Sequence, residues 1–398
     1  MPNKSDSLMF NPTEEHKLLR QTIQQFVKEK VEPQAETYDR IEQFNLELFR
    51  QLGTLGLLGI TAPIEWGGSG MDAVAAVIVH EELSYSDPGF CLAYLAHSML
   101  LVNNFAVNAS QEQKKEHLAR MCDGSCIGGM AMSEPHVGTD VLAMKTSAVR
   151  EGNYYRLNGQ KMWITNGVSD EQGTPADYLL VYARTGEKNN RPLISTFLIE
   201  KGMPGYRVGQ KIRGKCGMRA SNTAEIVFEN CLVPVTHLIG MEGDSIKHMM
   251  RNLEIERVTL AAMSVGIARR ALTIMNTYAS QREAFGKPIR EFGQIQKFIA
   301  ESYAEYQAAR CYLYHTAAHL NLTQEGQRLD SDGVKLFATT MAKNVCDRAI
   351  QVLGGYGYVS EYIVERLWRD SKLLEIGGGT LEAHQKNITR DLRTIDAF

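Results

Sequence analysis

The sequence predicts an α+β protein in three parts, with a helical first part, a β-rich middle and a helical last part. The first 125 residues and the region after about residue 239 carry apolar residues at spacings of three and four, which is typical of amphipathic helices. Between them, short runs of branched and aromatic residues are separated by glycine, asparagine and proline, a pattern typical of strands and turns. The predicted parts are therefore residues 1–125, 126–238 and 239–398.

Length, charge and cysteine content exclude several classes of protein. The 398 residues suffice for two or three core-forming units. A formal net charge of −3, without a run of lysine or arginine, argues against a nucleic-acid-binding protein. We find no stretch of about 18 apolar residues and expect no membrane span. The seven scattered cysteines favour reduced thiols and a cytoplasmic location, with the mitochondrial matrix as the alternative if a transit peptide was removed.

The first part contains several helix signals. We expect the first helix to be capped by Asn11, with Pro12 in its first turn, and to end at Pro33. Further helices are expected at 46–58, 73–83 and 90–107.

In the middle part we expect strands at 177–183, 193–199 and 223–228. Asn158-Gly159 predicts the turn of a hairpin between 154–157 and 160–165. The last part has long helical patterns at 245–280, 291–322 and 331–353.

Two neighbouring stretches of the middle part have the composition of a ligand site. Residues 131–140 combine short polar side chains with Gly138, where the backbone can approach a ligand closely. Trp163 stands beside Thr165, and an aromatic ring next to a hydroxyl suits a flat ligand that forms hydrogen bonds. An ordinary hairpin with a polar loop explains these stretches equally well.

A carboxylate interrupts an apolar helix stripe in the last part. Glu256 falls on the face that also carries Met249, Leu253, Leu260, Met263 and Ile267. Burial on such a face raises the pKa of a carboxyl group, so Glu256 is a candidate general base near neutral pH. The alternative is a buried ion pair between Glu256 and an arginine, such as Arg257 or Arg290.

Several motifs resemble the acyl-CoA dehydrogenases, FAD enzymes that desaturate acyl-CoA thioesters. They are Met-Ser-Glu-Pro at 132–135, Gly-Thr-Asp at 138–140 and the run 158–167, together with 96–98, 200–205 and 282–286. The resemblance extends from about Leu18 to Leu392 and is greatest to the isovaleryl-CoA dehydrogenase branch. It implies an N-terminal α-helical domain, a middle β-barrel or sandwich domain and a C-terminal four-helix bundle.

The resemblance also implies which residue is the base. Most of the family carries a glutamate in a late motif, which reads Gly-Gly-Gly-Thr here, with Gly378 at the position of the base. The isovaleryl branch carries its base on a helix instead, in a motif that matches residues 253–257. Glu256 is therefore implied as the group that removes the α-proton.

The remaining site residues follow from the same resemblance. The implied FAD contacts are Met132, Ser133, Gly138, Thr139, Trp163, Ile164, Thr165, Arg282, Phe285, Gln351, Gly354, Gly355, Thr380 and Glu382. The implied substrate contacts are Thr139, Glu254, Arg257, Gly378 and Gly379. Glu254 lies about 200° around the helix from Glu256, so the two carboxylates cannot face one ligand. We expect no metal ligands.

The predicted activity is FAD-dependent α,β-desaturation of a short branched acyl-CoA. Isovaleryl-CoA is favoured because Gly378 leaves room beside the reacting carbons. The resemblance implies an electron-transferring flavoprotein as partner and a homotetramer in which neighbouring subunits complete each FAD site. The alternatives are another acyl-CoA substrate, an enoyl-CoA reductase and a flavin-binding scaffold without activity. Gly293, Lys247 and Leu374 depart from the family pattern and leave the acyl specificity open.

Overall fold

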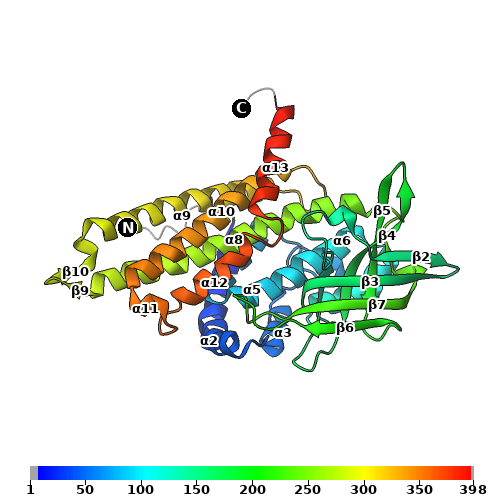
Figure 1. Cartoon of the computed structure of the whole chain (residues 1–398), viewed down its shortest axis with the longest axis horizontal. Coiled ribbons are helices and arrows are strands. Elements are labelled where there is room, and N and C mark those ends of the chain that lie inside the picture. Colours follow the sequence, from blue (N-terminus) through cyan, green and yellow to red (C-terminus); the bar gives the residue numbers. More distant parts are fainter. Residues whose placement is uncertain (1–7, 396–398) are drawn as a thin grey trace.

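The computed structural model describes residues 8–395 and has the predicted order of helices, sheet and helices (Figure 1). The first part contains α1 (Glu14–Phe26), α2 (Glu32–Ile41), α3 (Leu46–Thr54), α4 (Ala73–Ser86), α5 (Pro88–Leu95), α6 (Asn104–Asn108) and α7 (Gln111–Cys122). Two π-helical segments, η2 (Val27–Val31) and η4 (Ala96–Asn103), join α1 to α2 and α5 to α6.

Both predicted boundaries of the first helix are wrong. Thr13, not Asn11, caps α1, because its hydroxyl accepts a hydrogen bond from the His16 N–H at 3.3 Å. Asn11 instead accepts a hydrogen bond from the Arg20 side chain. Pro33 does not end the helical path but lies in the first turn of α2, where a residue without an N–H donor is tolerated.

The middle part is one eight-stranded sheet with two wings. Its strands are β1 (Gly128–Ala131), β2 (Ser147–Glu151), β3 (Tyr154–Thr165), β4 (Tyr178–Lys188), β5 (Arg191–Glu200), β6 (Tyr206–Lys211), β7 (Thr223–Pro234) and β8 (Leu238–Ile239). Their order is β6-β7-β3-β2-β4-β5-β8, and β1 also pairs with β4. One wing contains β6, β7, β3 and β2, and the other contains β1, β4, β5 and β8. The wings join through a single parallel pair, Ser147 with Arg184. Tyr155 of one wing packs on Phe197 of the other, with ring centroids 4.9 Å apart, so the wings share one core.

The predicted hairpin turn at Asn158-Gly159 is wrong. β3 runs through both residues, and the turn lies at Gly152-Asn153, where Glu151 of β2 pairs with Tyr154 of β3. The pairing of β3 with β7 shifts register between Leu157 and Gly159, which marks a bulge. A Cβ at Gly159 would lie 2.5 Å from the Thr146 hydroxyl, so glycine is needed here for close packing.

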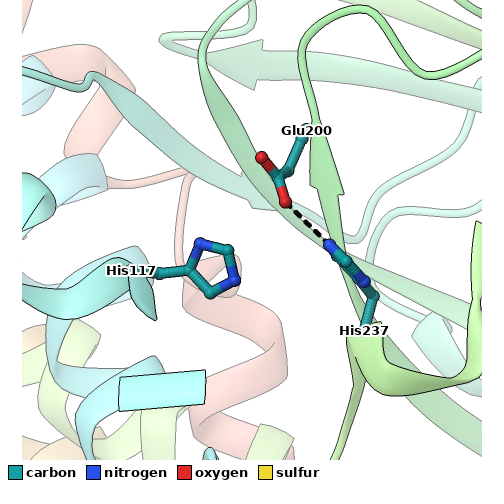
Figure 2. A group of neighbouring side chains, drawn as sticks. All are labelled: His117, Glu200 and His237. Atoms are coloured by element: carbon teal, nitrogen blue, oxygen red, sulfur yellow. Dashed lines mark hydrogen bonds and ion pairs between the residues drawn. The ribbon is translucent and has the colours of Figure 1, made fainter. Parts of the chain in front are cut away.

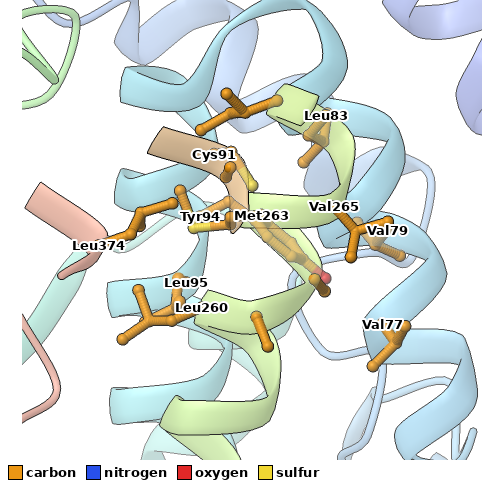
Figure 3. Packing of buried hydrophobic residues seen from close by; sticks show 14 of the residues in the cluster. Val77, Val79, Leu83, Cys91, Tyr94, Leu95, Leu260, Met263, Val265 and Leu374 are labelled. Atoms are coloured by element: carbon orange, nitrogen blue, oxygen red, sulfur yellow. The ribbon is translucent and has the colours of Figure 1, made fainter. Parts of the chain in front are cut away.

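The last part is the predicted helical bundle. It contains α8 (Ser245–Gln281), α9 (Gly293–His319), α10 (Arg328–Leu353), α11 (Gly355–Tyr358), α12 (Val364–Leu374) and α13 (Leu381–Asp391). The short strands β9 (Glu283–Ala284) and β10 (Lys287–Pro288) form a hairpin at the end of the bundle farthest from the sheet (Figure 1). The main core joins both helical parts, with Leu83 of α4, Tyr94 of α5, Met263 of α8 and Leu374 of α12 packed together (Figure 3).

The expectation that the sequence lacks an apolar stretch of membrane-spanning length needs correction. Pro88–Asn108 and Ser245–Gln281 are long and apolar enough to cross a membrane by length and composition. Within the protein, 89% and 72% of the respective windows are buried, so their apolar surface serves the core.

Candidate active site

Glu256 and Gly378 are 122 positions apart in the chain but meet in the structure. Glu256 lies on α8, and Gly378 lies in the loop between α12 and α13. A Cβ built at Gly378 would be 3.4 Å from both Cδ and Oε1 of Glu256. The helix position and the late-loop position therefore border the same space.

Glu256 has the environment expected for a general base. The stripe that carries it is buried, and its Oε2 atom is inaccessible to solvent without a hydrogen-bond partner among residues 8–395. Burial raises the pKa of Glu256, and the positive charges of Lys335 and Arg257 act against this rise. The alternative ion pairs are wrong, because Arg257 pairs with Asp332 at 3.2 Å and Arg290 donates to the Ser280 hydroxyl at 2.7 Å.

A buried polar cluster holds the loop next to Glu256. The Gly379 carbonyl accepts hydrogen bonds from Lys335 Nζ at 2.6 Å and from His384 Nε2 at 2.9 Å. The other nitrogen of His384 contacts Asp332, which also pairs with Arg257. Because both partners of His384 accept, both bonds form together only when the ring is protonated. Burial lowers the pKa of His384 and lowers that of Lys335 to about 7.

Leu260 fills the space beside Gly378. Its Cδ1 atom overlaps the position that a Gly378 Cβ would take. Leu260 therefore occupies part of the space that the missing side chain leaves, and room for a branched acyl chain at Gly378 stays a prediction. The size of the pocket depends on the flexible end of Leu260, which lies one helical turn after Glu256 on α8.

The implied contacts to the flavin ring gather at the end of β3. Trp163 is 63% exposed and has a positive φ of 66°, so its ring stands out from the strand. The Met162 N–H donates to the Ser133 carbonyl at 2.9 Å, which brings the 131–140 loop alongside. Thr165 is half-buried and Ile164 is buried. Met132 is half-buried, and Gly138 and Thr139 are exposed in the same loop.

Lys161 and Glu134 anchor this loop. Lys161 Nζ is buried and donates to the Met132 carbonyl at 2.9 Å and to the Glu134 carboxylate at 3.0 Å. Glu134 also accepts from the N–H groups of Lys145 and Thr146. Sequence reasoning missed this pair, although a charged residue within a strand pattern was a possible signal.

A second group of implied FAD contacts lies at the far end of the bundle. Arg282, Gly354 and Gly355 line one cavity of about 580 Å³ together with Tyr278 and Tyr356. Phe285, 96% exposed, lies between β9 and β10, and Gln351 is exposed on α10. This end is opposite the sheet, so one chain does not bring the two groups together (Figure 1).

The remaining predicted contacts have structural roles visible in the fold. The Thr380 hydroxyl caps α13 by accepting from the Ala383 N–H, and Glu382 is exposed in the first turn of that helix. The carboxylate of Glu254 accepts from the N–H groups of Gly326 and Gln327 at 2.9–3.2 Å.

Both groups suit parts of FAD. The exposed Trp163 ring with nearby hydroxyls suits a flat heterocycle. In the part of the chain that the structure describes, nothing lies within 4 Å of a Cβ at Gly138. Arg282 in a cavity bordered by two glycines suits a pyrophosphate, because guanidinium forms paired hydrogen bonds to phosphate and glycine permits close approach.

Comparisons with known proteins identify the family. Models of the acyl-CoA dehydrogenase N-terminal, middle and C-terminal domains match residues 13–125, 129–231 and 243–392. The chain is 41% identical to "Isovaleryl-CoA dehydrogenase, mitochondrial" of Solanum tuberosum, covering 98% of this chain and 92% of the relative. Butyryl-CoA dehydrogenase from Megasphaera elsdenii has a TM-score of 0.89 at 31% identity, covering 95% of this chain and 97% of that one.

A glutaryl-CoA dehydrogenase from Mycobacterium smegmatis, solved in complex with FADH2, has a TM-score of 0.88 at 28% identity, covering 97% of this chain and 96% of that one. The family is FAD-dependent, so FAD is the cofactor that the two residue groups fit. With all three family domains matched in order and relatives similar over nearly the whole length, this chain belongs to the acyl-CoA dehydrogenase family of oxidoreductases.

Proposed function

We propose that the chain catalyses α,β-desaturation of a short branched acyl-CoA, with isovaleryl-CoA as the preferred substrate. The observation that carries the chemistry is that Glu256, with one buried carboxylate oxygen, lies next to Gly378, a loop position that has no side chain. The preference for isovaleryl-CoA rests on the Solanum tuberosum relative. The butyryl-CoA and glutaryl-CoA enzymes of the same fold make other acyl-CoA substrates the second candidate.

Glu256 removes the α-proton of the thioester in this proposal. Its raised pKa brings its basicity nearer to neutral pH than that of an exposed glutamate. The main-chain N–H of Gly378 polarises the thioester carbonyl, and Lys335 and His384 hold the next peptide through the Gly379 carbonyl. When bound, FAD accepts the hydride that leaves the β-carbon.

The two separate cofactor groups support a shared FAD site. Arg282, Phe285, Gln351, Gly354 and Gly355 belong to the segment from α8 to β10 and to α10 and α11, whose shared end lies opposite the sheet that contains β3 and Trp163 (Figure 1). We propose that they complete the site of a neighbouring subunit in a homotetramer, and that an electron-transferring flavoprotein takes up the electrons. The cytoplasmic and mitochondrial locations both stay predictions.

A substrate panel tests the proposal. Purified FAD-loaded protein is mixed anaerobically with isovaleryl-CoA, butyryl-CoA and glutaryl-CoA, and loss of the oxidised-flavin absorbance is followed. Fastest bleaching by isovaleryl-CoA is expected. Faster bleaching by another acyl-CoA would overturn the proposed substrate but not the proposed dehydrogenase activity. An unchanged spectrum with all three would favour a flavin-binding scaffold without activity. Leu260→Ala should widen the accepted acyl chains because Leu260 fills the space at Gly378.

A further inference from the structure

Two histidines and a glutamate meet where the first helices contact the β domain. His117 comes from α7, Glu200 from the end of β5 and His237 from the short helix η6 (Val235–His237) (Figure 2). One ligand atom of each lies within 4.8 Å of the others. His117 is buried, and the other two side chains are partly buried. These residues are remote in sequence, so only the fold reveals the cluster.

Hydrogen bonds orient both imidazole rings in the same way. Nδ1 of His117 contacts the Tyr178 hydroxyl at 3.2 Å, and Nδ1 of His237 contacts the Thr236 hydroxyl at 3.3 Å. Each ring therefore keeps Nε2 for the cluster, and His237 Nε2 lies 2.7 Å from Glu200 Oε1. Metal-binding histidines are typically held through their other nitrogen in this way.

The charged neighbours of the cluster on α7 are Glu116 and Arg120. The exposed Glu116 carboxylate lies 3.7 Å from His117 Nε2 and adds negative charge, whereas the Arg120 guanidinium is directed to the Tyr178 hydroxyl at 3.4 Å.

We propose that His117, Glu200 and His237 bind a divalent transition-metal ion of the zinc class, with water or Glu116 as fourth ligand, and thereby clamp α7 to the β domain. Two imidazoles and one carboxylate are a recurrent zinc ligand set. Tetrahedral bonds of this kind place ligand atoms about 3.4 Å apart, so the widest pair would approach by up to about 1.4 Å, and His237 Nε2 and Glu200 Oε1, now 2.7 Å apart, would separate slightly.

The ion would take the place of the hydrogen bond between His237 and Glu200. The contact between α7 and the β domain is already held by Gln113, which donates to the carbonyls of Thr236 at 2.6 Å and Leu238 at 2.9 Å. Little reorganisation of the backbone is therefore needed.

Zinc titration of the full-length, FAD-loaded protein after EDTA treatment tests this proposal. His315 and His319 form an exposed pair on α9 that could also chelate, so the titration uses His315→Ala/His319→Ala as its background. We expect one zinc ion per chain by elemental analysis and a higher Tm with zinc. Glu200→Gln, which keeps shape and the acceptor for His237, should weaken zinc binding by more than about tenfold.

His237→Asn is the second variant and should abolish the zinc-dependent rise in Tm. Cobalt replaces zinc in a parallel titration, because a thiolate charge-transfer band would reveal binding at the exposed Cys216 or Cys311 instead. Absence of stoichiometric zinc in the background protein would overturn the proposal. So would equal affinity in Glu200→Gln, or a thiolate band in the cobalt spectrum. None of these readouts depends on dehydrogenase activity.

Discussion

Replacing Glu256 by glutamine should lower activity and raise stability at the same time. Glutamine keeps the size of the side chain but cannot take up the α-proton. Positioned bases contribute about 10²–10⁴-fold, which corresponds to about 3–5 kcal/mol of transition-state stabilisation. We expect the rate of flavin reduction by isovaleryl-CoA to fall within that range, while the protein stays yellow with bound FAD.

The stability effect follows from the buried oxygen of Glu256, which has no hydrogen-bond partner within the described residues 8–395. A raised pKa in the folded state means that ionising Glu256 costs more free energy in the folded chain than in the unfolded chain. The free energy of unfolding is therefore highest when Glu256 is protonated, below the pKa of the unfolded state. It falls as the pH rises through the pKa of the folded state. Glu256→Gln should therefore equal the wild type near pH 4 and exceed its Tm near pH 8.

Stopped-flow flavin reduction and thermal unfolding at both pH values measure the two effects. Glu305→Gln, a change in a partly buried glutamate that pairs with Arg348 on the outer helices, is the matched control. General damage to the fold would lower rate and Tm together. A rate within a few-fold of wild type would refute the assignment of Glu256 as base. A lower Tm at pH 8 with a lost rate would refute the burial argument.

Three further outcomes are expected. Lys335→Met removes a charge that lowers the pKa of Glu256, so the rise of flavin-reduction rate with pH should move to higher pH, as a pH series would show. In a Glu256→Gln background, Gly378→Glu should restore part of the rate, because a side chain there starts 3.4 Å from the lost carboxylate. The new Cβ must displace the end of Leu260, and the positive φ of 65° costs about 1–2 kcal/mol, so the Tm should also fall. Arg282→Ala should lower the FAD content of purified protein by absorbance ratio, whereas Arg207→Ala on exposed β6 should not.

The local sequence pattern predicted the structure correctly where a single helix or strand determines it. The apolar spacing on α8 predicted both the long helix and the burial of its apolar stripe, because a helix face is set by residues three and four apart. Glu256 on that stripe is half-buried as a residue, with its Oε2 atom inaccessible to solvent. The same kind of local signal failed at Asn158-Gly159, where a turn dipeptide supplies a bulge instead of a turn. Pairing with β7 and contact with Thr146 decided that position, and neither is visible in the local sequence.

The residues that surround the base were not predicted. Lys335, Asp332 and His384 come from α10 and α13 and meet only after the helices pack. A lysine, an aspartate and a histidine on helices are usually solvated, so their sequence context carries no signal of burial. The His117, Glu200 and His237 cluster was missed for the same reason, because its members occupy three separate elements.

The location of Trp163 on β3 and of Arg282 beside β9, at opposite ends of the chain's fold, has a consequence for mixed assemblies (Figure 1). If neighbouring copies share each flavin, a copy defective in its base and a copy defective in its phosphate anchor damage different sites. When the two copies assemble together, some sites would contain an intact base from one copy and an intact phosphate anchor from the other. We expect such hybrids to recover activity that neither parent shows alone, which is complementation between two inactive copies.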